Sequence, residues 1–257
     1  VILFLAFYSI IIFVKEKTWK PYWPKTTKLF KNLLMSASLI MANWFVYIYA
    51  VNSGQIVESS LGYFINPLVN VVIGVVVLRE RLTLFQTVAT LLATVGVLII
   101  SWDQGHVPLI ALFLALSFSF YGLIKKLNPV SGLYSNQFES LILIPLAFGI
   151  LFFLEPIIGT PSAMLTGNID IKTILLLMGA GAITGLPLIF FAEAAQRLPF
   201  YLLGFFQFLA PSLQFMTGVL LFGEPLSHNK LIGFIFIWVA GGIIVTNNWL
   251  MAKPKAS

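Results

Sequence analysis

The chain has 257 residues, of which 59% are hydrophobic and only 9% are charged, and its formal net charge is +6. Charged side chains are too few to cover a water-soluble globule of this size, in which they usually make up about 25% of the residues. The apolar composition also excludes intrinsic disorder, and the lack of cysteine excludes disulfides and thiolate metal sites. The sequence therefore predicts a membrane protein.

Apolar segments of bilayer-spanning length recur along the chain. A membrane helix needs about 20 predominantly apolar residues. Eight segments approach or exceed this length, and they are 29–51, 56–78, 83–102, 107–124, 132–154, 171–194, 200–222 and 231–251. Residues 1–14 form a ninth, shorter apolar segment that we interpret as a truncated span. These elements predict an all-α membrane protein, here with nine spans.

The basic residues fall into alternate loops between these segments. They are six lysines from Lys15 to Lys31, then Arg79, Arg81, Lys125, Lys126, Arg197 and the C-terminal Lys253 and Lys255. All but two of the 15 basic residues therefore lie on one side, which the positive-inside rule makes cytoplasmic. The C-terminus is predicted to be cytoplasmic. Because these charges flank membrane spans, no nucleic-acid partner is expected.

A shift of 142 to 144 residues overlays two halves of the chain. Leu61-Gly62-Tyr63-Phe64 falls on Leu203-Gly204-Phe205-Phe206, Pro67 on Pro211, and Glu80 on Glu224. Arg79 and Arg81 fall on Gly223 and Pro225, so a basic loop becomes a non-basic one, as expected for halves of opposite orientation. The pattern predicts a 5+5 inverted repeat, with halves at residues 1–102 and 103–257. An intact repeat would have ten spans, so the first helix is expected to be missing from this chain.

Several stretches resemble the RarD branch of EamA-type carriers, in the drug/metabolite transporter superfamily. The most specific is the run from Glu58 to Asn70, and the others are Asn43-Trp44, 50–52, Glu80-Arg81, 120–123, 204–207 and Gly223-Glu224. The resemblance implies a ten-helix inverted repeat in the bacterial inner membrane that moves small organic molecules. The RarD branch is also associated by name with chloramphenicol sensitivity.

Two prolines at matched positions point to a candidate substrate site. Pro67 and Pro211 lie near the middle of their spans, where a proline removes one backbone hydrogen bond, and matched broken helices often border a midplane site. The alternatives are an ordinary kink for the prolines, interhelical hydrogen bonding for the amides, and core packing for the aromatic residues. The candidate substrate-binding residues are Asn43, Trp44, Tyr63, Asn66, Pro67, Asn70, Tyr121, Gln207, Pro211 and Gln214.

Two glutamates are candidates for proton coupling. Glu139 lies about seven residues into its helix, which offers it no basic partner, so it could exchange protons or bind a cationic substrate. A purely structural glutamate is the alternative. Glu58, near the outer end of its span, is the second candidate, and it could instead select substrate or lie among the headgroups. Glu193 and Arg197 have the spacing of an interfacial pair, and Gly181 and Gly185 that of close helix packing.

These features predict a secondary transporter that works by alternating access around a central site between the Pro67 and Pro211 helices. The expected partners are a small organic metabolite or drug, the lipid bilayer and, as an open alternative, protons, with the chain a monomer or homodimer.

No Walker loop is present, and His106 and His228 lie in predicted outer loops, so no cofactor, metal or catalytic site is expected. A channel or a non-transporting regulatory membrane scaffold remains the alternative.

Overall fold

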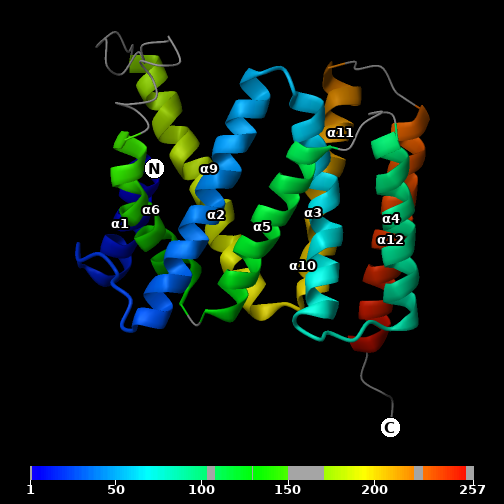
Figure 1. The fold of residues 1–257 in the computed structure, drawn as a ribbon, viewed down its shortest axis with the longest axis horizontal. Coiled ribbons are helices and arrows are strands. Elements are labelled where there is room, and N and C mark those ends of the chain that lie inside the picture. Colours follow the sequence, from blue (N-terminus) through cyan, green and yellow to red (C-terminus); the bar gives the residue numbers. More distant parts are fainter. Residues whose placement is uncertain (1, 103–107, 129, 150–170, 223–227, 253–257) are drawn as a thin grey trace. The chain divides into compact units, whose positions relative to one another are not determined.

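The computed structural model describes residues 2–102, 108–128, 130–149, 171–222 and 228–252 (Figure 1). These residues fold into helices joined by turns and loops, and no strand occurs among them. The helices are α1 (Ile2–Glu16), α2 (Thr27–Asn52), α3 (Ile56–Val76), α4 (Leu84–Trp102), α5 (Leu109–Leu127), α6 (Gly132–Gly149), α9 (Ile171–Arg197), α10 (Phe200–Gln207), α11 (Leu209–Phe222) and α12 (His228–Ala252). The predicted all-α fold is confirmed.

Five of the described helices have the length and composition of membrane spans. They are Thr27–Asn52, Glu58–Val76, Leu84–Trp102, Leu109–Leu127 and His228–Asn247. In α4, Ala89 and Ala93 are buried, whereas Leu91 and Leu98 are 62% and 60% exposed. An apolar side chain that points away from the protein core suits contact with lipid tails.

The predicted span over residues 200–222 is two helices rather than one. The chain breaks at Phe208, between α10 and α11, and Pro211 is the third residue of α11. In the first turn of a helix, the missing proline N–H costs nothing, because that group has no intrahelical partner there. Pro67, by contrast, lies inside the continuous helix α3. The two prolines therefore sit at different positions in their helices, although the sequence places both near mid-span.

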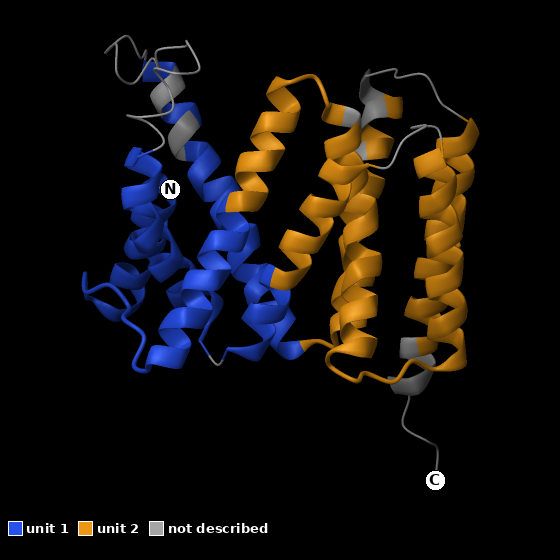
Figure 2. Ribbon diagram, viewed as in Figure 1, with its two compact units in different colours: residues 1–41, 121–197 blue, residues 42–120, 198–257 orange. Residues whose placement is uncertain are grey.

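The contacts divide the chain into two compact units (Figure 2). Unit 1 comprises residues 1–41 and 121–197, and unit 2 comprises residues 42–120 and 198–257. Helices α2 and α5 each contribute residues to both units. The division differs from the predicted repeat boundary at residue 102, since each unit draws on both halves of the sequence. The repeat itself remains a prediction.

In unit 1, α1 packs against α6 and α9. Tyr8 and Ile12 of α1 are buried, and the Tyr8 hydroxyl donates a hydrogen bond to the Gly185 carbonyl over 3.3 Å. A Cβ atom on Gly181 would lie 3.1 Å from the Leu3 Cβ atom, and one on Gly185 would lie 3.0 Å from the Phe7 ring. The two glycines thus permit close helix packing, as their spacing predicts.

In unit 2, α4 and α12 lie side by side (Figure 1) and cross at two facing glycines. A Cβ atom on Gly96 would lie 2.6 Å from the Gly233 carbonyl oxygen, and one on Gly233 would lie 2.7 Å from the Gly96 carbonyl oxygen. Only glycine allows the two backbones this separation. Thr83 and Gln86 start α4 with a reciprocal pair of side chain to backbone bonds, which is a capping box.

We predict that Gly233→Val destabilises the protein because its side chain would meet the α4 backbone. Overpacking of this kind costs on the order of 1–3 kcal/mol. Gly241→Val on the same helix is the matched control, since a Cβ atom there meets nothing within 4 Å. Thermal unfolding in detergent measures both variants. Equal unfolding midpoints for the two variants would contradict the glycine crossing.

Candidate functional site

Two of the predicted substrate residues bind the backbone and hydroxyl groups of α5, within unit 2. The Asn43 side-chain amide on α2 donates to the Leu114 carbonyl and to the Ser117 hydroxyl, each over 2.9 Å. Both protons of the amide are therefore used, and the side chain is only 9% exposed. Asn43 joins α2 to α5, which is the interhelical role that the sequence left open as an alternative.

Asn66 repeats this arrangement from α3. Its amide donates to the Ala115 carbonyl over 3.0 Å and to the Ser119 hydroxyl over 2.8 Å. Each asparagine thus bonds one carbonyl and one hydroxyl on neighbouring turns of α5. In a bilayer such amides need internal partners, and α5 supplies them to both flanking helices.

Asn70 and Gln207 join the Pro67 helix to the helix that precedes the Pro211 helix, within unit 2. The Asn70 side-chain amide donates to the Gln207 side-chain carbonyl, which links α3 to the last residue of α10. Gly204 makes the approach possible, because a Cβ atom there would lie 2.5 Å from the Pro67 carbonyl oxygen. Asn70 is fully buried, yet its side-chain oxygen has no hydrogen-bond partner. Among the predicted substrate residues whose side chains are described, Asn70 is the one with a buried polar atom that lacks a hydrogen-bond partner.

The remaining predicted substrate residues are less closely grouped. Tyr63 is 47% exposed and packs edge-to-face against Tyr47, with ring centroids 6.2 Å apart. Trp44 is half-buried on α2, and Pro211 is buried on α11. The side chain of Gln214 lies outside the described residues, as does Glu224, the predicted match of Glu80. Tyr121 belongs to unit 1 and is described there.

Glu58 caps a neighbouring helix. Its carboxylate accepts a hydrogen bond from the Ile110 backbone N–H over 2.9 Å, at the start of α5. A negative charge at a helix N-terminus satisfies a free donor and interacts favourably with the helix dipole. This contact gives Glu58 a structural partner that the sequence alone does not reveal.

Glu80 and Glu193 make the same kind of contact. The backbone N–H groups of Phe200 and Tyr201 donate to the Glu80 carboxylate over 2.6 and 3.0 Å, at the start of α10. Glu193 accepts from the Gly132 N–H at the start of α6, and it also pairs with Arg197 over 2.8 Å. The predicted Glu193–Arg197 pair is confirmed, and its carboxylate also secures α6.

Glu139 is different, since it forms a buried ion pair within unit 1. Its carboxylate lies 2.6 Å from the Lys125 ammonium, and both side chains are at most 5% exposed. The ammonium also donates to the Ser135 hydroxyl over 2.8 Å and to the Asn136 side-chain oxygen over 2.7 Å. All three ammonium protons are thereby used. The Tyr121 ring adds a cation–π contact, with its centroid 5.0 Å from the nitrogen.

The surroundings of this pair are polar but incompletely bonded. The Tyr121 hydroxyl donates to the Asn136 side-chain oxygen over 3.4 Å, and its ring stacks on Phe191. The Asn136 amide nitrogen and the Ser36 hydroxyl are buried and make no hydrogen bond of standard geometry, although the Ser36 hydroxyl lies close enough to the Glu139 carboxylate to interact with it. Buried polar atoms of this kind commonly bind an ordered water or change partner during function. The pair thus has spare hydrogen-bonding capacity beside it.

Lys125 is a candidate site residue that the sequence analysis placed in a loop rather than in a helix. The charge pattern assigned it, with Lys126, to a loop on the cytoplasmic side. In the structure Lys125 is buried and only 1% exposed. Its position in the last turn of α5 made a loop location plausible. Side chains on a helix lean towards its N-terminus, so Lys125 reaches away from the turn after α5 while Glu139 reaches back towards it. These opposite side-chain directions are the feature from which an ion pair between Lys125 and Glu139 could have been predicted.

Comparison with known proteins adds the family context. Residues 1–102 match the family described as the EamA-like transporter family. The "Uncharacterized transporter YojE" of Bacillus subtilis (strain 168) is 40% identical over 240 residues, which cover 91% of this chain and 78% of that protein. "Protein RarD" of Salmonella typhimurium (strain LT2) is 42% identical over 231 residues, which cover 90% of this chain and 77% of that protein.

A solved structure has the same fold. A crystal structure superimposes with a TM-score of 0.71, covering 95% of this chain and 85% of that one. The sequences are 16% identical, so the likeness concerns the fold alone.

We predict that breaking the buried ion pair destabilises the protein and that removing both charges restores much of the stability. Lys125→Met leaves the Glu139 charge buried and unpaired, which costs about 3–5 kcal/mol. The double variant Lys125→Met/Glu139→Gln has no buried charge and is expected to recover most of that loss. Chemical unfolding in mixed micelles measures the free energy of unfolding of each variant.

Arg197→Met is the control for this series, because the Arg197 side chain is 76% exposed. Loss of an exposed pair of this kind costs about 0–1 kcal/mol. A double variant no more stable than Lys125→Met would contradict the ion pair as the source of the effect.

Proposed function

Because this chain belongs to the RarD branch of the EamA-like transporter family, we propose that it carries small organic metabolites or drugs by alternating access. The family and the names of the relatives indicate a bacterial multi-pass membrane transporter of the drug/metabolite kind, rather than an enzyme. Membership also implies a small-molecule substrate and a lipid bilayer as partners. The mechanism, the substrate class and the coupling ion form the proposal.

The Asn70–Gln207 contact is the observation that carries the proposed substrate site. It joins α3 to the end of α10, next to the break at Phe208. The buried Asn70 oxygen lacks a donor, so a substrate hydroxyl, amide or amine would gain a hydrogen bond there. A break between helices at membrane depth is tolerated where it borders protein or a water-filled cavity, as at transport sites.

Alternating access at this site needs a contact that can form and break. An amide pair suits this role, because either amide can exchange its partner for a substrate group without leaving a buried charge. Asn43 and Asn66, with both amide protons bound to α5, would keep α2 and α3 fixed against that helix during the exchange. We assign direct substrate contact first to Asn70 and Gln207, with Tyr63 and Trp44 as aromatic walls.

Proton coupling is proposed at Glu139, with Lys125 as its partner. A proton taken up by Glu139 would cancel its charge and leave the Lys125 ammonium buried without a counter-ion, which is unfavourable. The unit would respond by rearranging α5 and α6 around the pair, where Asn136 and Ser36 have bonding capacity to spare. Glu58 is the second proposed proton site, since protonation would weaken its cap on α5.

The proposed setting is the bacterial inner membrane, with the C-terminus in the cytoplasm and the chain a monomer or homodimer. The support for this orientation is the distribution of lysine and arginine among the loops.

We predict gradient-driven uptake by the purified full chain in liposomes with an imposed proton gradient. The probes are salicylate, tryptophan and chloramphenicol, chosen as small aromatic or amphipathic compounds, and mass spectrometry measures their accumulation. Asn70→Leu is expected to lower uptake at limiting probe concentration by on the order of tenfold, the effect of one lost hydrogen bond of about 1–1.5 kcal/mol. Lys125→Met/Glu139→Gln is expected to equilibrate the probe without accumulating it.

The variants separate the alternatives. Accumulation by the double variant equal to that of the parent would remove Glu139 from the proton path but leave the carrier. In the parent, probe flux down its own concentration gradient that does not depend on the proton gradient would favour a channel. No flux of any probe would favour a regulatory scaffold. Arg197→Met, which alters only an exposed pair, is expected to transport as the parent does.

We also predict the orientation of two loops, using the natural lack of cysteine. Single cysteines at Ser53 and Ser131 are expected to react from the outside and from the cytoplasmic side respectively. An impermeant maleimide applied to right-side-out and inverted membrane vesicles measures this. Labelling of both positions from the same side would refute the predicted span count.

A further inference from the structure

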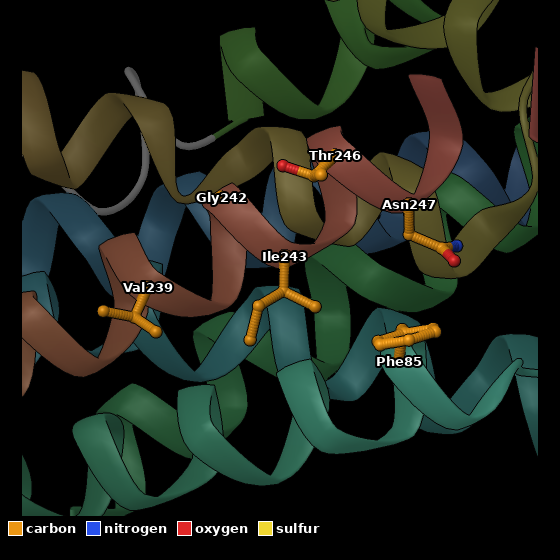
Figure 3. A pocket seen from close by; sticks show the side chains of 6 residues that line it. All are labelled: Phe85, Val239, Gly242, Ile243, Thr246 and Asn247. Atoms are coloured by element: carbon orange, nitrogen blue, oxygen red, sulfur yellow. The ribbon is translucent and has the colours of Figure 1, made fainter. Parts of the chain in front are cut away.

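A hollow lies on the exposed face of the contact between α4 and α12, within unit 2 (Figure 3). Its volume is about 390 Å³, and its lining residues are Phe85, Val239, Gly242, Ile243, Thr246 and Asn247. Volumes of about 300–1,000 Å³ are typical of small-molecule sites. None of the residues proposed for substrate or proton binding lines it, so it calls for a separate explanation.

The hollow exists because a glycine occupies an outward-facing position of α12. A Cβ atom on Gly242 would meet nothing within 4 Å, in contrast to Gly233, which contacts the α4 backbone. Ala240 and Ile244 of the same helix are buried in the core, so Val239, Gly242 and Thr246 lie on the opposite face. Figure 3 shows Ile243 and Phe85 on the facing helices along this space. The glycine leaves room for a ligand rather than for a neighbouring helix of the described chain.

The hollow is apolar along most of its length and polar at one end. Phe85, Val239 and Ile243 form apolar walls, whereas Thr246 and Asn247 close the end near the C-terminus of α12. The Thr246 hydroxyl is exposed and has no hydrogen bond to another described residue. On α4, by contrast, the hydroxyls of Thr90 and Thr94 donate to carbonyls four residues back. Thr246 thus presents a free hydroxyl at the end of an apolar channel.

One arginine, Arg81, lies near this polar end, and Arg79 belongs to the same connection between α3 and α4. The Asn247 amide lies 3.5 Å from the Thr83 hydroxyl, and Arg81 precedes Thr83 by two residues, a separation of at most about 7 Å along the chain. Arg79 and Arg81 are both exposed, and neither forms an ion pair with any residue of the described segments. Glu80 lies between them in the sequence, but its carboxylate binds the backbone at the start of α10, so neither arginine has an ion-pair partner among the described residues.

The backbone conformation of Arg79 supports a role for its charge in binding a ligand. Arg79 has a φ of 57°, in the left-handed region where α3 ends. Glycine is the usual residue at such a position because a Cβ atom is unfavourable there. In the predicted repeat the matching residue is Gly223. The first half thus places an arginine where the second half has the residue that the backbone prefers.

We propose that this hollow binds one anionic phospholipid. An acyl chain lies across Gly242 between Phe85 and Val239, and the phosphate accepts hydrogen bonds from Thr246 and Asn247 within reach of Arg81 and Arg79. The bilayer around a membrane transporter supplies both parts of this ligand. Basic residues beside a hollow between membrane helices are suited to an anionic headgroup. A neutral lipid or a second copy of the chain in the same space are the alternatives that the experiment tests.

Native mass spectrometry of the purified full chain tests the proposal, with dioleoylphosphatidylglycerol and dioleoylphosphatidylcholine as probes. We expect one phosphatidylglycerol molecule to remain bound at concentrations where phosphatidylcholine does not. Each arginine near the phosphate is expected to contribute about fivefold in affinity, from about 1 kcal/mol per basic residue. Arg81→Gln should therefore weaken phosphatidylglycerol binding about fivefold and leave phosphatidylcholine binding unchanged.

Two further variants separate lipid binding from folding. Gly242→Leu fills the hollow and is expected to abolish the bound lipid, whereas Gly179→Leu, at another glycine with open space around it, is expected to keep it. Arg79→Gly relieves an unfavourable backbone conformation, so its unfolding midpoint should equal or exceed that of the parent while its phosphatidylglycerol affinity falls about fivefold. A loss of affinity without a loss of stability is a result that misfolding cannot produce.

Three results would overturn the proposal. Equal retention of the two lipids by the parent would refute an anionic site. An unchanged lipid count in Gly242→Leu would refute the hollow as its location. A shift from dimer to monomer in Gly242→Leu, with lipid binding intact, would assign the hollow to a second copy of the chain.

Discussion

Satisfying polar groups where no water is available is the constraint on which the rest of this structure depends. In a bilayer, an unpaired backbone or side-chain group costs several kcal/mol, so each must find a partner within the protein. The chain meets this demand with a small number of side chains that each act across helices. Asn43 and Asn66 bind α5, and the carboxylates of Glu58, Glu80 and Glu193 bind the free N–H groups at helix starts. Polar residues in the described segments therefore determine which helices are neighbours.

The same constraint explains why only a few places remain for function. The amide N–H groups of Asn43 and Asn66 and the carboxylates of Glu58, Glu80 and Glu193 already have partners within the protein. The exceptions are the Asn70 oxygen in unit 2 and the Ser36 and Asn136 atoms next to the ion pair in unit 1. Transport requires groups whose partners can change, and these three are the buried side chains whose bonding is incomplete among the described residues. The proposed substrate and proton sites rest on this contrast.

Much of the fold could be predicted from the sequence, because apolar runs of membrane length are unambiguous in helical proteins. The bounds of α2, α3 and α4 agree with the predicted spans to within a few residues. The break at Phe208 could not be predicted, since Pro211 fits equally well in the first turn of a new helix. The glutamate caps were also missed, because Glu80 lies 120 residues from Phe200 and no local pattern records such a contact. For the candidate site, residue type indicated which groups are polar, but only the packing shows which are already bonded.

The buried pair of Lys125 and Glu139 has an electrical consequence. Together the two side chains carry no net charge, so a conformational change that moves them through the membrane field does no work against the potential. One unbalanced elementary charge carried across the whole field, by contrast, corresponds to about 2.3 kcal/mol per 100 mV. Adding a proton to Glu139 leaves the lysine charge unbalanced and makes the same movement sensitive to voltage. In the proposed cycle, the ion pair would thus separate a conformational step that does not depend on the membrane potential from a step that the potential drives.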